Sequence, residues 1–439
     1  MIPATHITDT TVQCARCGKP HHAVIERENG EVFGRVDCPW EPAKLRLSTD
    51  AGLYLALRER SRCLAQRGST AKRSVINLLP ITDTCNFKCP VCYAACGPLA
   101  NPRHLSLAEV MDRARKARAT GARAVCLTGG EPTMHPDLVR IVHEVRGLGF
   151  KVFLITNGYR LGTEPALARA LRVAGLNKVD LQFDTLEPEV HQQLRGNRFV
   201  QEKINAARNV LAAGIRLGTV TTVTALNLAE VGKLIEFGLS LAPGLKTIMF
   251  QTAIPVGRFE LKASQIVDRE QILKHVFACR ALPGISLEDA WPFPHVEPWG
   301  MRVHPDCSVS LVLFRDSKGL HFAREWIDLE QLNERLHALG SNRHWWARNW
   351  GPLRQLLAST RPGRRLAVLG NLLSFLTGRG TRSATLIAVS SACPPGFIDE
   401  SRLAGCATSE LRADGGVSPC ACYLAAAPIT LTDRPQDLN

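Results

Sequence analysis

Residues 84–93 read TCNFKCPVCY, and in this stretch Cys85, Cys89 and Cys92 are followed directly by the aromatic Tyr93. Thiols this close together are typical of a zinc site, a redox site, a disulfide framework or an iron–sulfur cluster. A [4Fe–4S] cluster ordinarily takes four protein thiolates, so a loop with three leaves one iron open to bind another molecule. The plainer alternative is a zinc ion completed by a distant Cys or His.

The composition around this stretch is that of a globular protein. The chain has 439 residues, of which 45% are hydrophobic and 21% charged, enough for two or three cores. The start, MIPATHITDT, has no secretion-signal pattern, and no run of about 18 apolar residues occurs, which predicts a cytoplasmic protein. In that reducing compartment the 15 cysteines are expected to serve metal binding or catalysis. The net charge of +14 indicates an acidic partner: nucleic acid, an anionic membrane or a phosphorylated substrate.

The first region, residues 1–70, is predicted to be a small metal-binding module, like a zinc ribbon or rubredoxin. It would hold one iron or zinc ion, since both metals accept four thiolates. For the fourth ligand we favour Cys63 over His21 or His22. The complete set of candidate ligands is Cys14, Cys17, Cys38 and Cys63.

The second region, residues 71–283, alternates short apolar runs with helical patterns. Ser106 and Glu109 have the spacing of a capping box at the start of one such helix. The alternation predicts βα units and a parallel sheet, arranged as a partial (β/α)6 barrel with chemistry at the carboxyl ends of its strands. The apolar runs are residues 75–81, 124–130, 151–158, 178–184, 217–224 and 247–253.

Polar signals follow three of these runs. GGEP (129–132) comes after the second, and its glycines would let the backbone approach a ligand while Glu131 accepts a hydrogen bond from an amino group. Asn157 follows the third run. Gln182 and Asp184 end the fourth, spaced to point to one face of a strand.

The cysteine loop, GGEP and the βα alternation together resemble the radical S-adenosylmethionine (SAM) superfamily over about residues 75–260. The resemblance implies a [4Fe–4S] cluster that takes an electron from a low-potential donor such as ferredoxin or flavodoxin. Reductive cleavage of SAM at the open iron would then give a 5'-deoxyadenosyl radical. It also implies residue roles: Cys85, Cys89 and Cys92 as cluster ligands, Tyr93 beside the adenine, Gly129, Gly130, Glu131 and Pro132 at the methionine moiety, and Asn157, Gln182 and Asp184 along the ribose or carboxylate.

The flanks are similar to the subgroup that contains the tetraether lipid synthases and the class D radical SAM methylases. Matching pieces are FQTAIPVGR (250–258), HPDCSVSLVLF (304–314), CPPGFIDESRLAGC (393–406) and DGGVSPCACY (414–423). The resemblance implies that the third region, residues 284–439, holds one or more auxiliary [4Fe–4S] clusters. Their candidate ligands are Cys307, Cys393, Cys406, Cys420 and Cys422. Cys126 and Cys279 are instead expected in the core.

A helical segment at about 330–382 is basic and aromatic. Residues 343–382 hold eight arginines, no acidic residue, and Trp345, Trp346 and Trp350. Such a makeup is typical of an amphipathic helix on an anionic membrane, which would make the protein peripheral at the inner face. The alternative is a helical cap whose Trp and Leu side chains pack inward.

Three functions remain open at this point. The first is a radical SAM transferase that forms a carbon–carbon bond at an unactivated carbon of a lipid. The second is radical methylation or another modification of a small molecule or peptide. The third, a zinc-ribbon nucleic-acid-binding protein, leaves GGEP without a purpose and lacks a reading module, so no nucleic-acid partner is expected.

Overall fold

The computed structural model describes residues 4–14, 17, 19–39, 43–65, 76–119, 122–292, 304, 306–338, 345–377, 383–404, 406, 408–412, 415–417 and 420. The chain divides into two compact units. Unit 1 comprises residues 1–72, 218–252 and 266–407. Unit 2 comprises residues 73–217, 253–265 and 408–439. Each unit therefore combines segments that are far apart in the sequence.

Unit 2 is built on a mostly parallel sheet with the strand order β9-β8-β7-β5-β18-β19. The pairs β5–β7, β7–β8, β8–β9 and β5–β18 are parallel, whereas β19 is antiparallel to β18. The strands confirm the first four apolar runs as β-structure. Their bounds are β5 (Ile76–Pro80), β7 (Ala124–Thr128), β8 (Lys151–Thr156), β9 (Lys178–Gln182), β18 (Thr408–Arg412) and β19 (Gly415–Val417).

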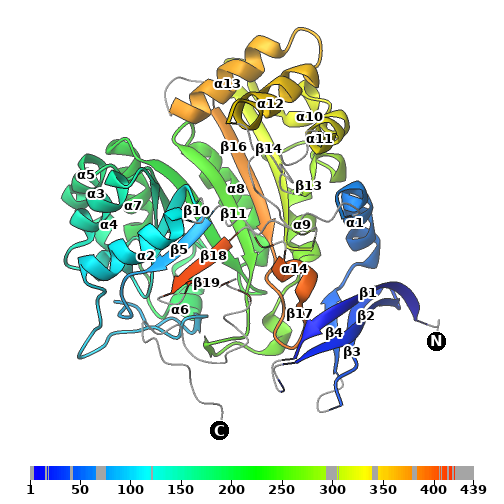
Figure 1. Cartoon of the computed structure of the whole chain (residues 1–439), viewed down its shortest axis with the longest axis horizontal. Coiled ribbons are helices and arrows are strands. Elements are labelled where there is room, and N and C mark those ends of the chain that lie inside the picture. The colour runs from blue at the N-terminus through cyan, green and yellow to red at the C-terminus, as the bar shows by residue number, and fades with distance from the viewer. Residues whose placement is uncertain are drawn as a thin grey trace. The chain divides into compact units, whose positions relative to one another are not determined.

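Helices follow the strands of unit 2, as the alternation predicted, and Figure 1 shows α3, α4, α5 and α7 grouped together beside the sheet. The capping box at the start of α2 is confirmed: the Ser106 backbone N–H donates to the Glu109 carboxylate at 2.7 Å, and the Glu109 N–H donates to the Ser106 hydroxyl at 3.3 Å. The helices are α2 (Leu107–Ala119), α3 (Leu138–Gly147), α4 (Tyr159–Thr163), α5 (Pro165–Val173), α6 (Pro188–Arg195) and α7 (Val200–Ala212).

His191 on α6 makes the stability of unit 2 depend on pH. Its ring is fully buried, and Nδ1–H donates to the Asn197 carbonyl at 2.7 Å. Burial, assisted by the charge of Lys203, lowers the pKa of His191 from 6.5 to about 4. The folded state therefore keeps the imidazole neutral, whereas the unfolded state binds a proton as the pH falls below 6.5.

We expect the free energy of unfolding to decrease as the pH falls from 6.5 toward 4, by up to about 3 kcal/mol from this group. His191→Gln should remove this part of the pH dependence, because glutamine cannot bind the proton. Chemical unfolding at about pH 7 and about pH 5 measures the difference. His143→Gln, at an exposed position on α3, is the control; an equal effect of both variants would contradict the prediction.

Unit 1 contains an antiparallel sheet at its N-terminal end, with the order β17-β1-β2-β3-β4. β17, which is far from β1 in the sequence, pairs with the end of that first strand: Val12 lies opposite Asp399 and Gln13 opposite Ile398. Phe397 fills the space beside Gly34, where a Cβ atom would lie 2.3 Å from the ring. The strands are β1 (Thr5–Gln13), β2 (Pro20–Glu28), β3 (Glu31–Val36), β4 (Ala43–Ser48) and β17 (Ile398–Asp399). Helix α1 (Ala51–Ala65) follows β4.

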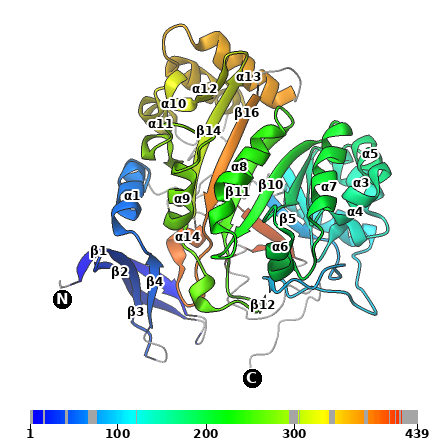
Figure 2. The same ribbon diagram turned by 180° about the vertical axis from the view of Figure 1, so that it is seen from behind.

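The rest of unit 1 has a second sheet region with the order β13-β14-β16-β11-β10, and β15 pairs with β14. β11 and β16 are parallel, and β14 runs antiparallel to β16, side by side in Figure 2. β10 and β11 confirm the fifth and sixth apolar runs. The strands are β10 (Arg216–Val223), β11 (Leu245–Thr252), β13 (Trp291–Pro292), β14 (Ser308–Asp316), β15 (Gly319–Phe322) and β16 (Ser383–Ser390).

Helices of unit 1 cover this second region. A compact core of Phe314, Ala323, Trp326, Ile327 and Val368 joins strands and helices there. Cys126 in β7 of unit 2 and Cys279 in unit 1 are both buried, so the expectation that they are core residues is confirmed. The helices are α8 (Val231–Ser240), α9 (Arg269–Phe277), α10 (Ala323–Trp326), α11 (Leu329–Ala338), α12 (Trp345–Ala358), α13 (Arg365–Thr377) and α14 (Glu400–Ala404).

Candidate functional site

The three-cysteine loop of unit 2 follows strand β5. Cys85 is buried, Cys89 and Cys92 are partly buried, and the backbone N–H of Phe87 donates to Cys85 Sγ at 3.4 Å. Burial, followed by the Glu131 carboxylate, raises the pKa of the Cys85 thiol. Burial also raises the pKa of Cys89, although Arg195 opposes it. Burial thus disfavours the negatively charged thiolate form of these cysteines. The positive charge of a metal cluster would compensate for this, so the three neighbouring thiols fit a metal cluster.

GGEP holds the cysteine loop in place. A Cβ atom on Gly129 would lie 2.3 Å from the Thr82 carbonyl oxygen, and one on Gly130 would lie 2.1 Å from the Thr84 oxygen. The Gly130 and Glu131 N–H groups donate to these two carbonyls, each at 2.8 Å. The close approach expected of the glycines is therefore made to the chain's own backbone, immediately before Cys85.

The Glu131 carboxylate ties the ends of β7 and β8 together. Its Oε1 accepts from the Thr133 N–H at 3.0 Å and from the Thr133 and Thr156 hydroxyls at 2.6 Å each. Its Oε2 accepts from the Asn157 N–H at 2.7 Å. Burial of a carboxylate is costly unless donors surround it, and here four donors do so.

Asn157 connects the end of β8 to the cysteine loop. Its Nδ2 donates to Asn86 Oδ1 at 2.8 Å and lies 3.9 Å from Cys85 Sγ. Its Oδ1 accepts from the Tyr159 N–H at 3.0 Å. The polar residue that the sequence placed at this strand end is thus next to the first cysteine.

Gln182 and Asp184, at the end of β9, contact each other and two buried cations. Asp184 is fully buried, and Arg195 donates to both of its oxygens, from Nε at 2.6 Å and from an Nη at 3.0 Å. The other Nη donates to the Val91 carbonyl at 2.9 Å, and the guanidinium also hydrogen-bonds Cys89. Burial disfavours the charged form of Arg195, but the attraction of the Asp184 carboxylate is stronger than this effect and raises the pKa of Arg195. In this arrangement Asp184 holds a cation beside the second cysteine.

Lys203 on α7 is the second buried cation. Its Nζ donates to the Asn157 carbonyl at 2.8 Å and to the backbone and side-chain oxygens of Gln182 at 2.9 and 2.6 Å. Burial lowers the pKa of Lys203 to about 8. Neither Arg195 nor Lys203 was predictable from the sequence, because each occupies an ordinary helical position with no motif around it.

Arg258 clamps the far end of the loop. Its guanidinium donates to the carbonyls of Cys89 at 3.0 Å, Ala95 at 2.7 Å and Cys96 at 2.9 Å. The preceding Gly257 has a φ of +66°, and a Cβ there would lie 2.3 Å from the Tyr93 carbonyl oxygen. Both residues belong to FQTAIPVGR, a motif that was recognised in the sequence without a role for its arginine. Tyr93 itself is 39% exposed.

The C-terminal cysteines divide between the two units. Cys307, Cys393 and Cys406 lie in unit 1, and Cys420 lies in unit 2; Cys422 is outside the described residues. Arg402 on α14 donates from Nε to Cys307 Sγ at 3.3 Å. Burial disfavours the charged form of Arg402, but Cys307 and Cys393 favour it and help to raise the pKa of Arg402. Both thiols therefore lie near this cation.

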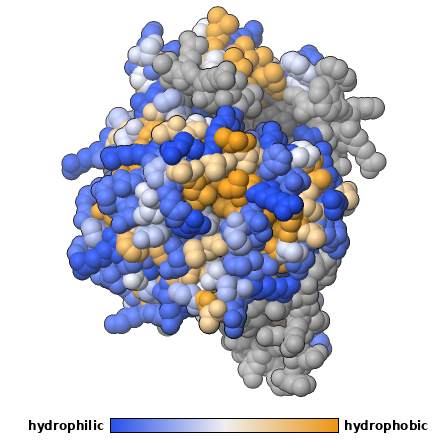
Figure 3. All heavy atoms as spheres, turned by 90° about the vertical axis from the view of Figure 1, so that its left-hand side faces the viewer, coloured by the Kyte–Doolittle hydropathy of each residue, from blue (hydrophilic) through white to orange (hydrophobic). Residues whose placement is uncertain are grey.

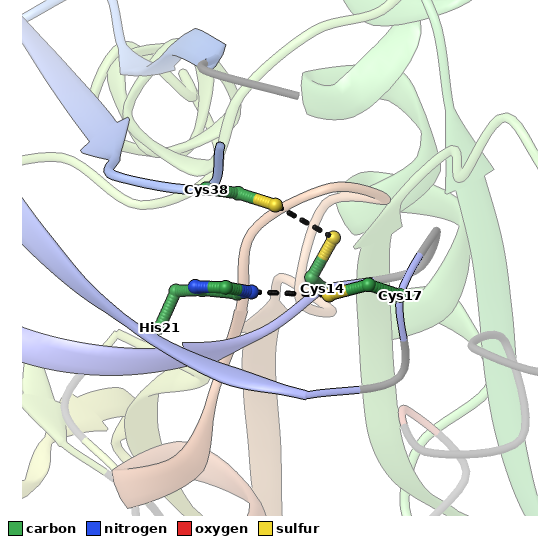
Figure 4. A group of neighbouring side chains, drawn as sticks. All are labelled: Cys14, Cys17, His21 and Cys38. Carbon is green, nitrogen blue, oxygen red and sulfur yellow. Dashed lines mark hydrogen bonds between the residues drawn. The ribbon is translucent and has the colours of Figure 1, made fainter. Parts of the chain in front are cut away.

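The N-terminal cysteines of unit 1 form a compact group with His21 (Figure 4). Cys14 Sγ and Cys38 Sγ are 3.6 Å apart, and Cys17 Sγ lies 3.0 Å from His21 Nε2. All four ligand atoms lie within 4.8 Å of one another, which is close enough for a single metal ion. The structure thus adds His21 to the three cysteines.

The other two candidates for the fourth position are placed differently. Cys63, which the sequence favoured, belongs to α1, but its side chain is outside the described residues. His22 is exposed and its ring nitrogens pair with Asp9 and Asp37, each at 3.0 Å.

Comparisons with known proteins agree with this geometry. The family model of the Radical SAM superfamily matches residues 79–238. The chain is 25% identical over 374 residues to 7,8-dihydro-6-hydroxymethylpterin dimethyltransferase of Methanocaldococcus jannaschii, covering 75% of this chain and 73% of that protein. It is 36% identical over 164 residues to GTP 3',8-cyclase of Marinobacter nauticus, covering 36% of this chain and 48% of the cyclase.

Among solved structures, Streptococcus suis SuiB aligns with a TM-score of 0.41 and 14% identity over 58% of this chain and 67% of SuiB. Residues 79–238 belong to the Radical SAM superfamily, and the cysteine loop and parallel sheet of unit 2 agree with a radical SAM iron–sulfur enzyme. The matches to GTP 3',8-cyclases span 48–65% of the length of those proteins.

Proposed function

We propose that this enzyme attaches a one-carbon unit to an unactivated carbon of a small molecule, as a radical SAM methyltransferase. The observation that carries the proposal is the match to a dimethyltransferase over 75% of the chain, which includes more than the core that the cyclases share. Methylation was the second candidate from the sequence. A reduced pterin, the substrate class in the name of that relative, is the first substrate to test.

We propose Cys85, Cys89 and Cys92 as the residues that would hold the [4Fe–4S] cluster. When bound there, cluster and SAM together supply a 5'-deoxyadenosyl radical that removes hydrogen from an unreactive carbon. The residues of this chain contribute the surroundings: Glu131 and Asn157 fix the loop that carries Cys85, and Arg195 places a positive charge beside Cys89. The electron would come from a ferredoxin or flavodoxin.

The test is an anaerobic assay of iron-reconstituted protein with SAM, a low-potential reductant and 7,8-dihydro-6-hydroxymethylpterin. One SAM would take an electron and give methionine and 5'-deoxyadenosine, and a second SAM would donate the methyl group and leave S-adenosylhomocysteine, with the reductant supplying two electrons per methyl group. We expect both adenosyl products and a pterin heavier by about 14 mass units per methyl group, because hydrogen is replaced by methyl. Formation of 5'-deoxyadenosine with an unchanged pterin would contradict the substrate and leave the chemistry standing. No cleavage of SAM under any condition would contradict both.

A second candidate is carbon–carbon coupling of two lipid chains. It is favoured by the exposed apolar and basic surface of α12 and α13, described below. Membrane-lipid extract replaces the pterin in the same assay, and coupling would appear as a product with the mass of two chains minus two hydrogens.

We further propose that Cys14, Cys17, His21 and Cys38 bind zinc, because three cysteines and one histidine are a common donor set of structural zinc sites. Cys38→Ser should lose most of the zinc and lower the unfolding temperature of the N-terminal sheet, since metal binding contributes directly to the folding of small modules. Elemental analysis and calorimetry measure both effects. His22→Gln, next to the site but paired with carboxylates, should change neither. One equivalent of iron instead of zinc would contradict the proposal.

A further inference from the structure

Helices α12 and α13 of unit 1 turn one face toward the interior. Leu356 of α12 and Ala367 and Val368 of α13 pack with the core around the fully buried Trp326. Asn371 of α13 is buried on the same side as Val368. The inner face therefore already anchors both helices, and the side chains on the opposite face are not required for this core.

The outer face is apolar and exposed. Leu366 and Leu373 of α13 are 81% and 62% exposed, and seven residues apart they lie on one side of the helix. On α12, Trp350 is 56% exposed, and Trp350, Arg354 and Ala358 form one exposed stripe four residues apart. Figure 3 shows an apolar patch among hydrophilic side chains at the top of the view, where Figure 1 places α12 and α13.

Exposed arginines lie beside this outer face. Arg354 of α12 and Arg365 of α13 are exposed. Arg361 and Arg364, between the two helices, are also exposed but contact the Arg324 carbonyl and the Trp326 ring. The sequence has no Asp or Glu between residues 335 and 398, so no acidic side chain of this segment offsets their charge. An apolar face framed by positive charge complements a surface that offers both hydrocarbon and negative headgroups.

We propose that the outer face of α12 and α13 docks reversibly on an anionic membrane surface. Tryptophan prefers the boundary between headgroups and hydrocarbon, and the two leucines would enter the hydrocarbon edge. None of the helices in the described part of the chain has both the length and the apolarity of a membrane span. A second copy of the chain is a poorer occupant, because a two-fold contact would bring the arginines of both copies together.

Vesicle sedimentation of the full-length protein tests the proposal, without SAM or reductant, so that the result is independent of the proposed methylation. We expect binding to vesicles of phosphatidylcholine with phosphatidylglycerol and at least about tenfold weaker binding to phosphatidylcholine alone. Leu366→Glu/Leu373→Glu should weaken the binding by about tenfold or more, since it removes two inserting side chains. Arg354→Gln/Arg365→Gln should weaken it by about 25-fold, at about fivefold per arginine, and added salt should likewise weaken the binding of the wild type.

The control variant is Val173→Glu, which replaces an 88% exposed apolar residue on α5 of unit 2 and should bind as the wild type does. Circular dichroism and retained SAM cleavage establish that each variant is folded. Equal binding to both kinds of vesicle, or unchanged binding of the leucine variant, would overturn the proposal. A dimer in lipid-free buffer that Leu366→Glu/Leu373→Glu dissociates would overturn it as well, because the face would then be a contact between copies.

Discussion

The variant Cys85→Ala/Cys89→Ala/Cys92→Ala is expected to form no 5'-deoxyadenosine above background and to bind about four fewer iron atoms per chain than the wild type. The reason is that GGEP, Asn157 and Arg258 hold this loop through hydrogen bonds to its backbone and to the Asn86 side chain. The variant therefore retains its fold while it loses the three thiolates. Iron and sulfide analysis with a chromatographic assay for 5'-deoxyadenosine measures both losses.

Cys279→Ala is the matched control, because this buried thiol contacts the Gly232 carbonyl in unit 1 and no proposed ligand. It should keep the iron content and the SAM cleavage of the wild type. Iron that remains in the triple variant then counts the auxiliary clusters. A triple variant that still cleaves SAM would show that the cluster used for cleavage lies elsewhere in the chain.

Asp184→Asn is expected to destabilise unit 2 by about 3–5 kcal/mol, the usual cost of removing one partner of a buried ion pair. Arg195 would stay buried without its carboxylate, and its contacts to Val91 and Cys89 would weaken. We therefore also expect a much lower rate of SAM cleavage. Urea unfolding and the cleavage assay, carried out on the same preparation, measure the two effects.

The double variant Asp184→Asn/Arg195→Gln separates stability from function. It removes both charges, so it should recover most of the lost stability, but not the cleavage rate, because the contacts of Arg195 to Cys89 and Val91 are lost. Glu189→Gln, on α6 like Arg195, breaks the exposed pair of Glu189 with Arg198, which follows the helix, and should cost at most about 1 kcal/mol. If Asp184 contacts SAM directly, Asp184→Asn would instead raise the KM for SAM at unchanged unfolding free energy.

The parts of the fold that were predictable from the sequence are those whose signals are local. Each of the six apolar runs became a strand, since burial on both faces of a parallel sheet selects such runs. The Ser106–Glu109 capping box formed because both partners lie within one helical turn. The three cysteines of residues 84–93 and GGEP indicated the candidate site for the same reason, because each motif is contiguous in the sequence. Both motifs lie in unit 2.

Residues that act through long-range contacts could not be predicted in this way. Arg195 and Lys203 look like surface cations on helices, and only the tertiary structure buries them beside Asp184 and Gln182. His21 could not be ranked above Cys63, because ligand distances depend on how β1 and β2 pair. The spacing of the C-terminal cysteines likewise gives no indication that Cys307 and Cys393 share Arg402.

The pairing of β1 with β17 has a consequence for synthesis on the ribosome. The N-terminal sheet emerges first, but the strand that pairs with Val12 and Gln13 of β1, and the Phe397 ring that fills the space at Gly34, leave the ribosome more than 350 residues later. During that interval this end of β1 lacks its strand partner, a state that favours pairing with other nascent chains. Chains that terminate before β17 should therefore aggregate more than the full-length chain, even though they contain all four residues of the proposed N-terminal zinc site.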